Sequence, residues 1–434
     1  MIPTLLLRSQ ALALLIIALF AGIVQAHELR PTISEVSFPE GEERWRIVFQ
    51  PINLEALVGR IGADHDDTND SANAAVYDGL RELASGDLRA RFDDFAPEFL
   101  SNINVMAGDQ RLEAEIESVI IPPEGDLALP RDSLVTIGGA LPEGVSEIVI
   151  SWSPQYGDLV VRAPVNANGE GYAGFLSGGE ASAPLIVTGG ADQTAMEAFL
   201  DYLVVGFEHI LPLGLDHILF VIGLFLLSTA FRPLLIQITA FTLAHTVTLA
   251  LGALGYINIP GSIVEPLIAL SITFVAVENI FSDKLNKWRP FVIFGFGLLH
   301  GLGFAGVLSE FGFAPGQFVA SLIAFNIGVE IGQLAVIAIC FLLVGIWFAK
   351  RDWYRPGIVY PASLAIGGYS FAWFIERSFE LELPILAVVA LTLAMGVILL
   401  AIKGWRDRMA MGAYVLACAA ALTYLLRIIE GMIP

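Results

Sequence analysis

The chain has 434 residues, and its mean hydropathy of +0.70 with only 15% charged residues excludes an ordinary soluble protein. Its charge is unevenly distributed, because residues 27–195 hold 10 arginines, no lysine and 29 acidic residues, a balance of −19 within a total of −21. Such an acidic surface repels nucleic acid and attracts cations, so we expect no nucleic-acid partner.

The first 26 residues have the pattern of a signal peptide. Arg8 supplies a positive charge, residues 11–23 form an apolar run, and Val24-Gln25-Ala26 resembles a cleavage site for signal peptidase. Cleavage there would leave His27 as the first residue of the mature chain. The alternative is an uncleaved signal anchor, and both alternatives place the next segment outside the cytoplasmic membrane.

Residues 27–195 are predicted to form a β-rich, sandwich-like extracytoplasmic domain. Runs of alternating or β-branched residues, punctuated by Gly and Pro, occur at 46–49, 134–137, 147–152, 159–161 and 185–187. Helical spacing of apolar residues over 72–103 predicts a helical insertion. The segment 62–70 contains four aspartates and His65. This composition is typical either of a solvated loop or of a site for a hard cation. His27 and His65 are therefore the candidate metal ligands of this domain.

Residues 196–434 are predicted to form a polytopic helical membrane domain of about 7 to 8 transmembrane helices. The apolar stretches fall at 214–230, 233–252, 262–281, 290–310, 316–348, 358–376, 384–402 and 410–429. Ahead of them, residues 196–211 have the character of an amphipathic helix at the outer interface.

The distribution of Lys and Arg predicts how these spans are oriented. If the β-rich domain lies outside, the connections after the first, third, fifth and seventh spans are cytoplasmic and should be basic. The opposite connections carry only Arg377. The predicted cytoplasmic connections carry Arg232, Lys284, Lys287, Arg289, Lys350, Arg351, Arg355, Lys403, Arg406 and Arg408.

Ionisable residues recur within these apolar stretches, where each costs about 2.5 to 3.5 kcal/mol or more. Because both cysteines lie in apolar runs, a thiolate cluster is excluded and a metal would meet nitrogen and oxygen ligands. Neutral imidazole and carboxylate suit nickel, cobalt, zinc and ferrous iron. The alternative is that these residues only make hydrogen bonds between helices. The candidate metal ligands are His209, Asp216, His217, His245, His300, Glu330 and Glu278.

Their positions along the helices predict a succession of depths. At 1.5 Å per residue, His217 lies ~5 Å from the outer boundary, His245 ~10 Å and His300 ~15 Å. Glu330 follows at ~20 Å and Glu278 at ~25 Å. Such a succession is typical of a translocation route, whereas a hydrolytic site would gather its ligands at one depth. The upper three histidines lie close enough in depth to leave both alternatives open.

Polar neighbours of these ligands are candidates for an outer shell that orients them. Thr242 lies one helical turn before His245, and Asn279 is adjacent to Glu278. Asn326, Glu330 and Gln333 share one helix face by their three- and four-residue spacing.

Five segments of the chain resemble the HupE/UreJ family of bacterial membrane proteins. They are GFEHILPLGLDHILFVIGLFLLS, AFTLAHTVTLALGALG, IVEPLIALSITFVAVEN, FGFGLLHGLGFAGVL and FNIGVEIGQLAVIA, which together cover most of residues 200–348. The family signature His-Pro-x-x-Gly-x-Asp-His is matched by Gly214, Asp216 and His217, whereas Ile210 occupies the place of the first His and His209 stands one residue earlier. The resemblance implies a multi-pass protein of the bacterial inner membrane that handles nickel or cobalt.

Two functions from different classes are consistent with these observations. The first is a secondary permease for a divalent transition metal, with the acidic domain collecting cations. Nickel or cobalt is the expected ion, with zinc or iron as alternatives. The second is an intramembrane metal-dependent hydrolase, in which the upper histidines hold zinc and a glutamate is the general base.

Overall fold

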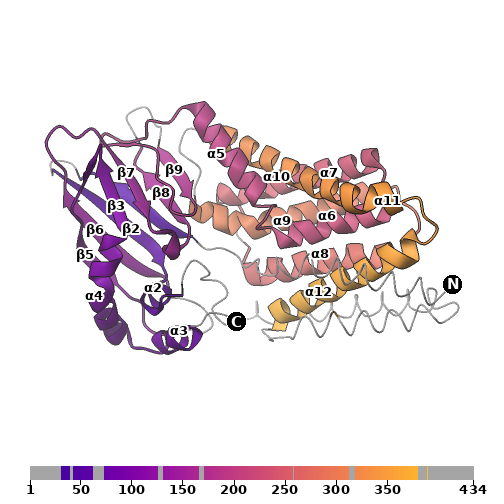
Figure 1. Ribbon diagram of the computed structural model, residues 1–434, viewed down its shortest axis with the longest axis horizontal. Coiled ribbons are helices and arrows are strands. Elements are labelled where there is room, and N and C mark those ends of the chain that lie inside the picture. Colours follow the sequence, from indigo (N-terminus) through magenta and orange to yellow (C-terminus); the bar gives the residue numbers. More distant parts are fainter. Residues whose placement is uncertain are drawn as a thin grey trace. The chain divides into compact units, whose positions relative to one another are not determined.

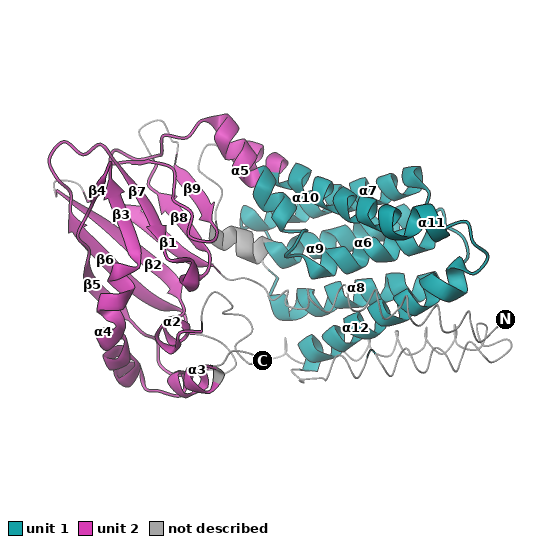
Figure 2. Ribbon diagram, viewed as in Figure 1, with its two compact units in different colours: residues 1–26, 203–309, 325–434 teal, residues 27–202, 310–324 magenta. Residues whose placement is uncertain are grey.

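The computed structural model describes residues 31–39, 43–61, 73–125, 131–165, 171–257, 259–311, 318–379 and 389. The predicted signal peptide, His27, the loop that contains His65 and the last two predicted spans lie outside the described residues. The chain divides into two compact units (Figure 2). One comprises Met1–Ala26, Leu203–Ser309 and Phe325–Pro434, and the other comprises His27–Tyr202 and Glu310–Ala324.

The N-terminal region is β-rich, as the sequence predicts, and contains two sheets (Figure 1). The larger sheet has the order β5-β6-β2-β1-β8-β9, in which only β1 and β8 pair in parallel. The smaller sheet has the order β10-β7-β3-β4. The strands of the larger sheet are β1 (Thr32–Ser37), β2 (Arg44–Ile52), β5 (Glu115–Ile120), β6 (Ser133–Ala140), β8 (Leu159–Ala163) and β9 (Tyr172–Leu176). Those of the smaller sheet are β3 (Ile103–Ala107), β4 (Gln110–Arg111), β7 (Glu147–Trp152) and β10 (Leu185–Ile186).

Both sheets contribute to a single apolar core. From Trp45 to Phe49 every second residue of β2 is buried, and β7 buries Trp152 by the same alternation. The rings of Phe49 and Trp152 stack at 5.8 Å between centroids, which joins the two sheets. Short helices α2 (Leu54–Gly59) and η1 (Pro154–Tyr156) lie in the connections.

Two further helices occupy the stretch for which helical spacing was expected. They are α3 (Ala74–Arg81) and α4 (Ser85–Ser101). Leu88, Phe92 and Phe99 are fully buried at four- and seven-residue spacing on α4, and Phe99 meets Phe49 edge-on at 5.9 Å. The apolar face of α4 therefore extends the core of the β-rich region.

The membrane region is entirely helical where the structure describes it. Four of its segments are long and apolar enough to cross a bilayer: Phe231–Ala253, Gly261–Phe281, Phe318–Phe348 and Arg355–Phe379. Leu215–Leu227 and Arg289–Phe304 are apolar but shorter. The protein is thus a membrane protein with four candidate spans among the described residues, and the predicted count of 7 to 8 is not confirmed.

The elements of this region, in chain order, carry the labels of Figure 1. They are α5 (Ala195–Glu208), α6 (Leu215–Leu227), α7 (Phe231–Ala253), α8 (Gly261–Phe281), α9 (Arg289–Phe311), α10 (Phe318–Cys340), η2 (Phe341–Gly345), α11 (Ile346–Phe348), η3 (Arg355–Val359) and α12 (Tyr360–Phe379). The sequence expectation of a helix within 196–211 agrees with α5.

Candidate metal centre

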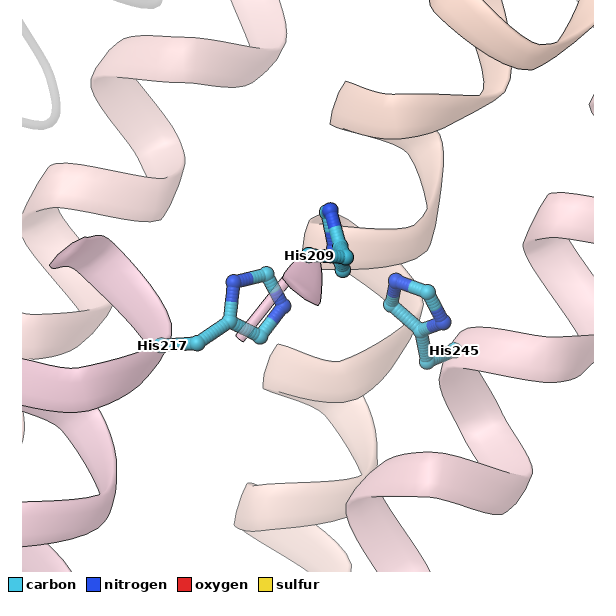
Figure 3. Close-up of side chains that lie close together, drawn as sticks. All are labelled: His209, His217 and His245. Carbon is cyan, nitrogen blue, oxygen red and sulfur yellow. The ribbon is translucent and has the colours of Figure 1, made fainter. Parts of the chain in front are cut away.

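Three imidazole rings from different parts of the chain meet within the membrane unit. His209 follows the end of α5, His217 is in the first turn of α6, and His245 is in the second half of α7. Each ring offers a nitrogen, and these three nitrogens lie within 4.8 Å of one another. Figure 3 shows the three side chains around a common space. Residues separated by 36 positions in sequence are thereby brought to one point.

A fourth histidine extends this group. His300 of α9 lies with its ring centroid 5.0 Å from that of His217, while His209 lies 4.8 Å from His217 on the same measure. His300 is 1% exposed and His245 is fully buried. We refer to His209, His217, His245 and His300 as the imidazole cluster.

Hydrogen bonds fix the orientation of three of the four rings. Nδ1 of His217 lies 2.9 Å from Oδ1 of Asp216, and Nδ1 of His300 lies 2.9 Å from the carbonyl oxygen of Phe296. Nδ1 of His245 makes a longer contact of 3.4 Å with Oδ1 of Asn326. Because each of these oxygens accepts, each neutral ring carries its hydrogen on Nδ1 and presents a bare lone pair at Nε2.

The Nε2 atoms are the end of the cluster that could hold a metal. All four Nε2 atoms are buried, and within the described part of the chain none has a hydrogen-bond partner. Leaving a buried hydrogen-bond acceptor without a partner costs about 1 to 3 kcal/mol of stability. Four such acceptors in one region therefore destabilise the fold considerably. A metal cation that accepts the lone pairs of His209, His217 and His245 would offset part of this cost.

The chemistry of the donors fits a divalent transition metal. Imidazole nitrogen is a borderline ligand that suits zinc, nickel, cobalt, copper and ferrous iron, whereas magnesium and calcium prefer oxygen. Nitrogens at ~2.0 to 2.1 Å from a tetrahedral ion lie about 3.4 Å apart. The three nitrogens of the structure are more widely spaced than that, at up to 4.8 Å.

Two glycines allow the backbone to approach closely around the cluster. A Cβ atom on Gly214 would collide with the carbonyl oxygen of His209, so glycine permits the tight turn that returns the chain from α5 to α6. A Cβ atom on Gly301 would collide with the carbonyl oxygen of His245 and with Oγ1 of Thr248. Small residues at such contacts let membrane helices pack closely, and here they bring α9 against α7.

Phenylalanine rings enclose the imidazole cluster. Phe304 and Phe325 stack on each other at 5.4 Å, with Phe304 4.2 Å from His209 between ring centroids. Phe241 lies 5.0 Å and Phe220 lies 5.3 Å from His300. This apolar shell excludes water and strengthens electrostatic interactions inside it.

The other candidates from the sequence lie outside the cluster. Glu278 pairs with Arg289 at 3.3 Å, and Asn279 donates from Nδ2 to the carbonyl of Gly223 at 2.8 Å. Glu330 accepts a hydrogen bond from Oγ1 of Thr239 at 2.7 Å. The structure therefore gathers the histidines at one point, whereas these two glutamates contact other partners.

Thr242 and Asp216 have contacts that differ from the sequence expectation. Oγ1 of Thr242 donates to Oε1 of Gln333 at 3.2 Å, because Gln333 faces it across the helix interface. The ring of His245 is contacted by Asn326 instead. Asp216, expected to be a metal ligand, directs Oδ1 to both the backbone N and Nδ1 of His217. Its contacts are those of a residue that orients a ligand.

Sequence reasoning missed two features of this site. The carbonyl of Phe296 orients His300 from one turn earlier on the same helix, a contact that the four-residue spacing of the two residues would have indicated. The enclosing phenylalanines come from α6, α7, α9 and α10, and nothing in their local sequence distinguishes them from ordinary lipid-facing residues.

Taken together, the helical membrane region and its buried imidazoles define an integral membrane protein with a candidate transition-metal centre. The family model described as HupE / UreJ protein matches residues 188–377. The resemblance of this region to the HupE/UreJ family, a family generally related to nickel and cobalt transport, is thereby confirmed. Compared with curated proteins and with solved structures, the chain has no match.

Proposed function

We propose that the protein is a secondary permease for a divalent transition metal in the bacterial inner membrane, with its β-rich domain outside. The observation that carries the proposal is the imidazole cluster, with four buried Nε2 atoms that lack hydrogen-bond partners among the described residues. The cargo is nickel or cobalt, with zinc or iron as the alternatives that imidazole ligands also suit. The family match over residues 188–377 supports this choice.

The charge of the chain supports the same function. Residues 27–195 carry 29 acidic residues against 10 arginines, which would raise the local concentration of cations. The sequence contains no nucleotide-binding loop, so an ion gradient or the membrane potential would supply the energy.

The experiment combines metal binding with transport by the full chain. Purified protein would be titrated with Ni²⁺, Co²⁺ and Zn²⁺, and uptake of radioactive Ni²⁺ would be followed in proteoliposomes. We expect His245→Ala to abolish both tight binding and uptake, because it removes a ligand from the imidazole cluster. Thr246→Val is the matched control on the same helix, since its hydroxyl donates to the carbonyl of Thr242 and does not contact the cluster.

A second candidate function is favoured by the gathering of the histidines at one point. A metal-dependent hydrolase holds its ion permanently, and its ligands converge as these do. The same experiment separates the two functions. Metal that copurifies with the protein, resists exchange and does not cross the membrane faster than in protein-free liposomes would contradict the permease and favour the hydrolase.

A further inference from the structure

A row of polar side-chain pairs leads away from the imidazole cluster along the interface of α7 and α10. Its first pair is His245 with Asn326, at 3.4 Å. The second is Thr242 with Gln333, at 3.2 Å, and the third is Thr239 with Glu330, at 2.7 Å. Each pair joins one residue of α7 to one residue of α10.

The spacing of this row matches the helical repeat. His245, Thr242 and Thr239 follow one another at three-residue intervals, which is about 4.5 Å along the axis of α7. On α10, Glu330 stands four residues and Gln333 seven residues after Asn326, about 6 Å and about 10.5 Å along the axis, so the second and third pairs cross each other between the helices. The row therefore runs from the imidazole cluster toward the N-terminal end of α7, which the distribution of Lys and Arg predicts to be cytoplasmic.

A second path from the imidazole cluster toward the same end of α7, between α6, α7 and α9, is apolar. Phe220 of α6 lies 5.1 Å from Phe241 of α7 and 6.1 Å from Phe296 of α9, between ring centroids. Phe220 and Phe241 are each 1% exposed. A divalent cation that passed between these three helices would lose all its polar ligands, which is prohibitive in a low-dielectric interior.

Glu278 and Glu330, the two glutamates that the sequence singled out as metal ligands, differ in their charge partners. Glu278 is paired with Arg289, which is 2% exposed. Among the residues that the structure describes, no cationic side chain pairs with Glu330, whose Oε1 accepts from Thr239. Since an ionisable residue in a membrane helix is costly, a carboxylate without a cationic partner points to a cation as its ligand.

We propose that Glu330, together with Thr239, Thr242 and Gln333, forms a second cation site that receives the divalent metal from the imidazole cluster. This inference rests on the proposed function and identifies the inner part of the route. Its donors are a carboxylate, two hydroxyls and an amide oxygen, which bind nickel, cobalt or zinc less tightly than a set of imidazoles does. A weaker site beyond a tight one allows an ion to leave, as conduction through successive sites requires.

The test measures binding and transport on the same set of variants. Ni²⁺ titration of the purified full chain should reveal one tight and one weaker cation per chain. Glu330→Gln should remove the weaker cation and leave the tight one, because its amide keeps the shape of the carboxylate without its charge. In proteoliposomes the initial uptake rate of this variant should fall at least about tenfold at saturating Ni²⁺. Thr239→Val should lower that rate as well.

Two control variants exclude a merely structural effect. Thr273→Val removes a comparable hydroxyl pair elsewhere, between Thr273 of α8 and Ser370 of α12 at 2.9 Å, and should retain the wild-type uptake rate. Glu330→Asp should restore part of the weak binding and part of the uptake, which a loss of packing would not allow.

The outcomes distinguish this inference from the proposed function. A wild-type chain that binds only one cation, or a Glu330→Gln variant with wild-type binding and uptake, would overturn the second site. A wild-type chain that binds two cations but takes up no more Ni²⁺ than protein-free liposomes would overturn the permease and leave the second site standing.

Discussion

Three of the four histidines of the imidazole cluster have an oxygen that accepts the Nδ1 hydrogen. A carboxylate does this for His217, an amide oxygen for His245 and a backbone carbonyl for His300. Only the carboxylate adds a full negative charge, which raises the basicity of the ring and stabilises a cation at Nε2. His217 is therefore expected to be the strongest ligand of the four.

This difference predicts the effect of Asp216→Asn. The amide oxygen of the new side chain can still accept from Nδ1, so the ring keeps its orientation but loses the charge behind it. We expect the affinity for Ni²⁺ to fall about 10- to 100-fold, the range typical of outer-shell partners of metal-bound histidines. Isothermal titration of the purified chain measures this affinity, with His217→Ala as the reference for loss of the ligand itself.

An Asp216→Asn variant with wild-type Ni²⁺ affinity would show that the carboxylate is not coupled to the metal. An affinity as low as that of His217→Ala would instead assign Asp216 as a direct ligand, as the sequence suggested.

At the scale of helices, the cluster exists because α9 packs closely on α7. Gly301 touches the backbone of His245, so these two positions set the separation of His245 and His300. Gly295 lies on the same helix, and a Cβ atom there would meet nothing within 4 Å. The two glycines form a matched pair for a test of close packing.

We expect Gly301→Ala to push α9 away from α7 and to widen the imidazole cluster. The cost in stability should be about 1 to 3 kcal/mol, as for other overpacked contacts, measured by thermal unfolding in detergent. Ni²⁺ affinity should fall by about 100-fold, since a displacement of ~1 Å has effects of that order at preorganised sites. Gly295→Ala should match the wild type in both measurements, and equal behaviour of the two variants would contradict the role of Gly301.

The sequence could predict the residues of the cluster but not their convergence. The cost of an imidazole in an apolar helix identified His209, His217, His245 and His300 one by one. Counting 1.5 Å per residue from the ends of apolar stretches spread three of them over ~10 Å, because such counting ignores the tilt and stagger of helices. Stagger is set by contacts such as that of Gly301 with His245, which depend on the whole helix interface.

The same limit applies to the outer shell and to the fold. Thr242 was assigned to His245 by spacing within one helix, but its partner Gln333 comes from another helix, and local spacing cannot reveal that.

The alternation of apolar residues in β2 and β7 predicted a β-rich region, since alternate side chains of a half-buried strand face the core. Strand order in the two sheets depends on long-range pairing and was not predictable from such patterns.

At the scale of the whole molecule, the orientation of the chain in the membrane decides the direction in which the proposed route would carry the metal. The connection from α8 to α9 contains Lys284 and Lys287, whereas the connection from α7 to α8 contains neither Lys nor Arg. The positive-inside rule therefore predicts that the former is cytoplasmic and the latter is outside. In that orientation Glu330 lies on the cytoplasmic side of the imidazole cluster, and the acidic N-terminal region faces the source of the metal.

Cysteine labelling tests this orientation directly. Tyr256 and Trp288 are 76% and 69% exposed in the two connections, so each can carry a reactive thiol. In a chain whose native cysteines are replaced by Ala, Tyr256→Cys should react with a membrane-impermeant maleimide in intact spheroplasts. Trp288→Cys should react only after the membrane is permeabilised, because its connection is predicted to be cytoplasmic. The reverse labelling pattern would show that the chain has the opposite orientation in the membrane. Glu330 would then lie on the outer side of the imidazole cluster, and the proposed uptake route would be a route for export.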